Sequence, residues 1–176
     1  MADRPARAAA PQTTRILGLD PGSRRLGYAV VDTRPRGQFV YRECGTITAP
    51  ERQPIEARLL ELATELRAVI RELRPVVAAV EDVFHQRNAR SALVLGQARG
   101  AALLCCAEAG LPVTSYPPAT VKKTVCGHGR APKEQVQRMV TALARLQRPP
   151  AEDAADALAI AICHSLHSNQ PPGATP

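Results

Sequence analysis

The chain has 176 residues, 45% of them hydrophobic, and its 23 Lys and Arg against 16 Asp and Glu give a formal charge of +7. This length and apolar content suit one folded domain and exclude a wholly disordered chain or a short peptide. Apolar runs such as Val76 to Val80 fall far short of the roughly 20 residues that cross a bilayer, and the N-terminus lacks the apolar centre of a signal peptide. We therefore expect a soluble, cytoplasmic protein, and its basic charge favours a polyanionic partner such as nucleic acid.

The first half of the chain is predicted to begin with strands. Residues 1–13 and 168–176 are rich in Pro with Ala and Arg or Gly, so we expect mobile ends around a folded region at 14–167. Strands are predicted at 15–20, 27–32 and 39–45. Periodic apolar residues then predict an amphipathic helix from Pro54 to a stop at Pro75. The run Val76 to Val80 is typical of a strand that is buried on both faces.

The second half alternates helices with one short strand. The pattern predicts helices at 89–109, 119–125, 132–146 and 152–166, and a strand at 112–116. Together the elements indicate an α/β fold: a mixed five-stranded sheet, its first three strands antiparallel, with helices on both faces. Ligand sites in such sheets form at the carboxyl ends of the strands.

Four acidic residues are expected to meet at that edge of the sheet. Asp20 ends the first strand, and Glu81 follows the buried run that ends at Val80. Asp153 and Asp156 lie three residues apart, on one flank of the last helix. Four carboxylates repel one another unless divalent cations neutralise them, and oxygen ligands suit Mg²⁺ or Mn²⁺. Two such ions about 4 Å apart serve phosphodiester hydrolysis. Taken singly, each acid also fits an ordinary role as a turn former, a strand end or a helix N-terminal residue.

The other polar residues give weaker signals. All three lysines, Lys122, Lys123 and Lys133, lie within twelve residues around a Gly-His-Gly turn. They indicate a loop that presents charge to phosphate, or one that is merely solvated. The five cysteines have no C-x-x-C spacing and indicate neither a disulfide framework nor a zinc site. The histidines expected on the solvated surface are His128, His164 and His167.

Four segments carry a resemblance to a known family. They are ILGLDPGSR at 16–24, VEDVF at 80–84, SALVLGQARG at 91–100 and DAADALAIA at 153–161. Over roughly residues 14–167 the chain closely resembles the RuvC family of crossover junction endodeoxyribonucleases, which resolve Holliday junctions. The resemblance implies a ribonuclease H-like fold, a homodimer, Mg²⁺ dependence, and paired symmetric nicks with ligatable 5′-phosphate and 3′-hydroxyl ends. It also implies a role in homologous recombination and DNA repair beside the branch-migration proteins RuvA and RuvB.

The resemblance also assigns roles to individual residues. The metal-binding acids correspond to the four named above, and Lys122 and Lys133 correspond to the family's basic loop. Phe84 corresponds to an aromatic that engages unpaired bases, although core packing is an alternative for a Phe. Three residues beside it are candidates to contact bases or phosphates, namely Arg87, Asn88 and Arg90. Asp82 departs from the family pattern, in which a neutral residue is expected.

A four-way junction has approximate two-fold symmetry. A C₂ dimer would therefore place two identical active sites on two DNA strands of like polarity. The small residues Gly96 and Gly100 would let a partner helix approach closely, although small residues in a soluble protein more often serve packing within one chain. A dimer interface on this helix is therefore mainly what the resemblance implies. Two other functions remain open. One is a non-catalytic junction-binding module of ribonuclease H-like fold. The other is a phosphotransferase of the actin-like ATPase class, for which 176 residues leave too little room.

Overall fold

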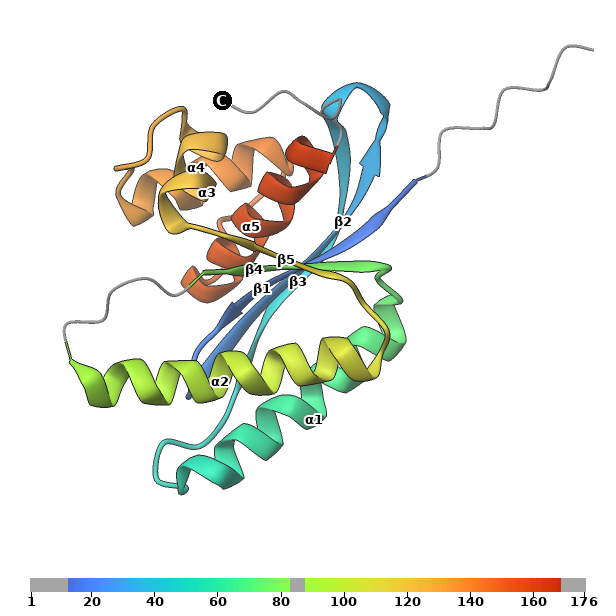
Figure 1. Cartoon of the computed structure of the whole chain (residues 1–176). Helices are drawn as coiled ribbons and strands as arrows, with labels where there is room; N and C mark the ends of the chain where they lie inside the picture. The colour runs from blue at the N-terminus through green and yellow to red at the C-terminus, as the bar shows by residue number, and fades with distance from the viewer. Residues whose placement is uncertain (1–12, 83–87, 169–176) are drawn as a thin grey trace, which may run out of the picture.

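The strands of the structure form one sheet in the order β3-β2-β1-β4-β5. The computed structural model describes residues 13–82 and 88–168 (Figure 1). Within them, β1 and β2 pair antiparallel, as do β2 and β3, while β4 runs parallel to β1 and β5 parallel to β4. The strands are β1 (Arg15–Pro21), β2 (Arg25–Arg34), β3 (Gln38–Thr48), β4 (Val77–Glu81) and β5 (Val113–Tyr116). The predicted mixed sheet, with its first three strands antiparallel, is confirmed.

Helices cover both faces of this sheet (Figure 1). The crossover helices α1 (Ile55–Leu73) and α2 (Ala89–Glu108) lie on one face. The opposite face carries α3 (Pro118–Cys126), α4 (Lys133–Leu143) and α5 (Glu152–Ser168). The two cores follow the alternation of side chains along each strand. On β1, Leu17 and Leu19 pack toward α1 and α2, and Ile16 packs toward α5.

Helix α5 is the most deeply packed helix of the described chain. Its residues from Ala154 to Ser165 are buried, except for Asp156, because it lies between the sheet and the pair α3 and α4. This packing overturns the expectation that His164 is solvated. His164 is buried, and its Nδ1 lies 3.0 Å from the hydroxyl of Tyr116. His128 is exposed, as predicted.

Some boundaries differ from the prediction. The helix expected to run to residue 146 ends at Leu143, and Arg145 takes a left-handed backbone with φ 54°. Strands β2 and β3 extend beyond their apolar centres at both ends, because their pairing runs from Arg34 and Gln38 at the turn to Arg25 and Thr48 at the far end. The predicted mobile ends, 1–13 and 168–176, fall almost wholly outside the described residues. All five cysteines are free thiols. Among the described helices, none has the length and apolar character needed to cross a bilayer.

Candidate active site

Two acids stand side by side at the carboxyl ends of β1 and β4. Leu19 pairs with Val80 in parallel register, and the next residue on each strand is an acid, Asp20 or Glu81. Side-chain alternation decides which face they occupy. Asp20 is two residues from Gly18, which contacts α5, and Glu81 is two residues from Ala79, which belongs to the core under α5. Both carboxylates therefore lie on the α5 face.

Two glycines, Gly18 of β1 and Gly27 of β2, bring α5 close to the sheet. A Cβ built on Gly27 would lie 2.0 Å from the carbonyl oxygen of Asp153, and one on Gly18 would lie 2.2 Å from that of Ala157. No side chain fits between the strand backbones and the helix backbone at these positions. The first turns of α5 consequently lie directly over the strands, which brings Asp153 and Asp156 to the edge that carries Asp20.

The pKa values show that the four acids form one electrostatic cluster. Burial raises the pKa of Asp20 to about 7, with further upward contributions from Glu81, Asp156 and Asp153. Burial also raises the pKa of Glu81, and the charge of Asp156 adds to that rise. The pKa of Asp156 is raised first by burial, and Asp153 contributes. The charged forms of Asp20, Glu81 and Asp156 are thus disfavoured by desolvation and by neighbouring carboxylates, as expected of a site that holds cations.

Two of the three lysines flank this cluster. Lys133, at the start of α4, forms an ion pair with Glu152, and its charge opposes the rise in the pKa of Asp20, Glu81 and Asp156. Lys122 of α3 acts in the same direction on Glu81 and Asp156. Lys123 is exposed on another side of α3, because consecutive helical residues point about 100° apart.

The donor chemistry of the cluster fits a hard divalent cation. It offers only carboxylate oxygens, largely buried and mutually repelling, which suits Mg²⁺, Mn²⁺ or Ca²⁺ rather than zinc. In the part of the chain that the structure describes, no three His, Cys, Asp or Glu side chains converge closely enough to hold one ion. The fit therefore rests on donor type, burial and charge, and not on a preformed coordination shell.

Comparison with known proteins decides the family. The family model described as crossover junction endodeoxyribonuclease RuvC matches residues 16–164. The chain belongs to the RuvC family. A crossover junction endodeoxyribonuclease RuvC of Halorhodospira halophila is 51% identical over 158 residues, which cover 90% of this chain and 93% of that protein. A RuvC of Xanthobacter autotrophicus is 51% identical over 154 residues, 87% of this chain and 90% of that protein.

Solved structures agree with this assignment. Thermus thermophilus RuvC in complex with a Holliday junction substrate matches with a TM-score of 0.82 at 33% identity, covering 89% of this chain and 95% of that one. The yeast mitochondrial Holliday junction resolvase Ydc2 matches with a TM-score of 0.62 at 12% identity, over 90% of this chain and 80% of that one. The second likeness shows a shared fold alone. The predicted ribonuclease H-like fold is confirmed.

Asp82, the departure from the RuvC family pattern, lies on the other face of β4 from the acid cluster. Its Oδ1 lies 3.8 Å from Nη2 of Arg99, a residue of α2. Arg99 also donates to the carbonyl oxygen of Glu81 at 3.3 Å and to the hydroxyl of Ser115 at 2.7 Å. Asp82 therefore contributes to fixing the end of β4 and does not join the carboxylates. Sequence analysis missed Arg99, although a lone Arg beside the buried residues Ala98 and Ala102 is a usable signal.

Of the remaining predicted DNA-contact residues, two are described by the structure and two are not. Phe84 and Arg87 lie outside the described residues. Asn88 is the N-cap of α2, where its side chain accepts a hydrogen bond of 2.9 Å from the backbone N–H of Arg90. The side chain of Arg90 is exposed and lines an open groove.

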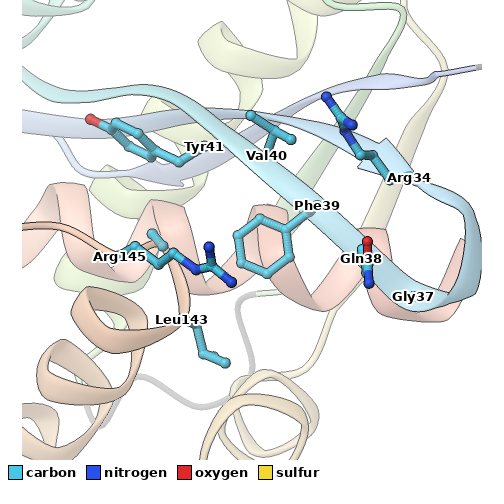
Figure 2. Close-up of a pocket in the computed structure, with 9 residues that line it drawn as sticks. Arg34, Gly37, Gln38, Phe39, Val40, Tyr41, Leu143 and Arg145 are labelled. Atoms are coloured by element: carbon cyan, nitrogen blue, oxygen red, sulfur yellow. The ribbon is translucent and has the colours of Figure 1, made fainter.

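A separate cavity lies far from the acids. It has a volume of about 540 Å³, between the start of β3 and the end of α4, with Phe39, Leu143 and Arg145 in its wall (Figure 2). Arg34, another wall residue, is seven residues along β2 from Gly27, a separation of roughly 23 Å in an extended strand. No predicted site residue lines this cavity, so it does not belong to the site.

We expect the protein in a metal chelator to lose stability as the pH rises from about 4 to about 7. In the unfolded chain Asp20 has the ordinary pKa of 3.8, whereas in the folded chain its pKa is about 7. Between these values the folded state holds a proton that the unfolded state has released, so raising the pH favours unfolding. Urea unfolding at about pH 5 and pH 7 measures the effect, and Asp20→Asn should flatten it. An identical pH slope in both proteins would show that Asp20 is not the group responsible.

Proposed function

We propose that this protein is a structure-selective endonuclease that resolves Holliday junctions by hydrolysing phosphodiester bonds. The observation that carries the proposal is the meeting of Asp20 and Glu81, on adjacent strand ends, with Asp153 and Asp156 of α5. Family membership supports it, because crossover junction endodeoxyribonucleases half identical to this chain cover almost its whole length. The expected role is in homologous recombination and DNA repair in the cytoplasm, with RuvA and RuvB as partners.

The four carboxylates would hold two divalent cations, with Mg²⁺ as the expected metal and Mn²⁺ as a substitute. Cations bound there would activate water and stabilise charge on the phosphate, giving 5′-phosphate and 3′-hydroxyl ends. The chain supplies the rigid support for this chemistry. The parallel register of β1 and β4 fixes two of the carboxylates, and the close approach of α5 fixes the other two.

The lysines that flank the cluster are suited to hold the DNA backbone. Lys122 and Lys133 lie close enough to the acids for their charges to oppose the rise in the pKa of Glu81 and Asp156. A phosphate that contacts both these lysines and the acid cluster would therefore be the reacting phosphate. Lys123 is exposed and would contact a neighbouring phosphate. Asn88 and Arg90 are proposed to contact the junction at the start of α2, and Phe84 and Arg87, outside the described residues, stay proposed DNA contacts from the family resemblance.

We further propose that two chains assemble through α2. One face of this helix carries exposed Leu93 and Leu104, whose relative exposures are 64% and 55%. Between them, Gly96 and Gly100 have no neighbouring atom within 4 Å of a Cβ built on either one. These residues recur at three- and four-residue steps and form one apolar stripe that a second copy of α2 would cover. A C₂ dimer built this way would present two active sites to one junction.

Gly100→Glu is expected to convert the dimer into a monomer of 18.9 kDa. The new carboxylate would be desolvated and unpaired against the partner helix, which weakens association by roughly 100-fold or more. Light scattering after gel filtration measures the mass. Ala142→Glu, at an exposed position of α4, is the matched control and should leave the mass unchanged. A dimeric Gly100→Glu protein would place the interface elsewhere.

The proposed function is tested on synthetic four-way junctions. The purified protein is incubated with a mobile and an immobile junction, with Mg²⁺ or with a chelator, and the products are mapped and ligated. Paired, ligatable nicks that require the metal would establish resolution. Tight binding with no nicks in Mg²⁺ or Mn²⁺ would favour the non-catalytic junction-binding module instead.

A further inference from the structure

We propose that Arg24, Arg58 and Arg90 form a phosphate-binding subsite on the α1 and α2 side of the sheet. The subsite would hold the backbone of the DNA strand that enters the acid cluster. This inference rests on the proposed nuclease function, and it assigns binding roles to Arg24 and Arg58, which the sequence analysis did not single out.

The three arginines converge on one open groove from separate parts of the chain. Arg24 comes from the turn between β1 and β2, Arg58 from the first turns of α1, and Arg90 from the start of α2. Hydroxyls of Ser23 and Ser91 add further hydrogen-bond donors, and Val94 and Leu95 supply apolar contacts. No acidic residue is among the described residues that line this groove. The 20-residue helix α2 begins beside it, and the positive end of its dipole adds to the attraction for an anion.

A second groove continues from the first toward the acids. The two share Ser23 and Arg24, and the second also contains Arg25, the acid Glu51 and the catalytic candidate Asp153. Arg25 lies 3.9 Å from the carboxylate of Asp153. The turn between β1 and β2 therefore links the arginine groove to the acid cluster without a break. A DNA strand whose reacting phosphate lies at the acid cluster would place its neighbouring phosphates in these two grooves.

The state of the arginine side chains favours phosphate as the ligand. Nε of Arg58 is buried and has no hydrogen-bond partner among the described residues. Such a donor is costly unless an acceptor reaches it or the guanidinium turns to meet one. Arg24 is paired with Glu51, but both side chains are largely exposed, at 59% and 68%, so the pair is weak and can exchange. Guanidinium groups bind phosphate oxygens with paired hydrogen bonds.

The geometry points to a polymeric rather than a small anion. The arginine groove is open and shares Ser23 and Arg24 with the second groove, so it suits a chain of phosphates better than one enclosed anion. The lysines Lys122 and Lys133 lie with α3 and α4 on the opposite face of the sheet. The DNA strand would thus be held by arginines on one face of the sheet and by lysines on the other, with the acid cluster between them.

The test uses the full chain and a fluorescent four-way junction bound in Ca²⁺, titrated at several salt concentrations. Arg58→Gln should weaken binding about tenfold, the value of one charged hydrogen-bonded contact. It should also lower the slope of log K against log salt by about 1, because one fewer counterion is released. Arg24→Gln and Arg90→Gln should each act in the same direction. Arg58→Lys should restore the salt slope because it keeps the charge.

The control is Arg71→Gln, an exposed arginine near the other end of α1 that changes the net charge equally. It should leave both affinity and slope unchanged. The loss of cleavage in Arg58→Gln should be larger at subsaturating than at saturating junction, which separates binding from chemistry. An unchanged slope in all three glutamine variants, with wild type still cutting, would overturn the subsite alone. A wild type that never cuts would overturn the proposed function, while the salt slopes would still report on the subsite.

Discussion

Asp156→Asn is expected to bind four-way junctions with wild-type affinity or better while its cleavage rate falls by about 10³-fold or more, equivalent to roughly 4 kcal/mol of transition-state stabilisation. The substitution keeps the size of the side chain and removes one of the carboxylate charges that would hold the cations. It also removes one of the charges that raise the pKa of Asp20 and Glu81. DNA binding should survive because the contacts to phosphate come from Lys and Arg side chains.

A gel-shift titration in Ca²⁺ and a single-turnover cleavage assay in Mg²⁺ measure the two effects separately. Glu65→Gln, which removes an equal charge from an exposed position on α1, is the matched control and should cut at the wild-type rate. Unchanged cutting by Asp156→Asn would remove this residue from the catalytic set. A junction affinity that fell along with cutting would mean that Asp156 positions the DNA-binding groups instead.

Gly27→Ala is expected to damage both the fold and the site. The new Cβ would meet the carbonyl oxygen of Asp153 at 2.0 Å, and its carbonyl carbon at 2.6 Å, so the first turn of α5 must move. Backbone atoms cannot rotate away as a flexible side chain can, and overpacking of this kind costs about 3 kcal/mol or more. Thermal unfolding should shift down by roughly 6 to 12 °C for a chain of this size. Cleavage should fall as well, since Asp153 moves with the helix.

Gly96→Ala, made in the Gly100→Glu protein so that no partner helix covers the position, is the matched control, because a Cβ there meets nothing within 4 Å of its own chain. In the middle of α2 it should be neutral or stabilising by up to about 1 kcal/mol, the difference in helix propensity between the two residues. Differential scanning calorimetry on both variants makes the comparison. Equal melting temperatures for Gly27→Ala and wild type would show that α5 does not lie against β2 as closely as described.

The identity of the four acids could be read from the sequence because each stands at the end of an element with a strong local pattern. The alternation and apolar runs of the strands located Asp20 and Glu81, and the three-residue spacing on a helix located Asp153 and Asp156. Those patterns depend on residues a few positions apart, so the chain itself carries them. The family motifs in the same segments are equally local, and the family assignment they implied is confirmed.

Other features depended on packing between distant segments. Lys122 and Lys123 are neighbours in the sequence, yet only the docking of α3 decides that Lys122 faces the acids. His164 looked solvated because its burial comes from the sheet and from α3 and α4, which are remote in sequence from most of α5. Asp82 follows directly after Glu81 in the sequence, yet strand alternation and its contact with Arg99 place it on the other face of the sheet.

The sequence alone determined the order and type of the elements and the family, and it singled out four acids as candidates, because these follow from residue periodicity and from motifs within single segments. The tertiary structure decided how those segments meet. Gly18 and Gly27 give no sign in the sequence that they admit the backbone of α5, and the arginine groove draws on β1–β2, α1 and α2 at once. Long-range contacts of this kind depend on which apolar surfaces are buried against each other, and no short stretch of sequence contains that information.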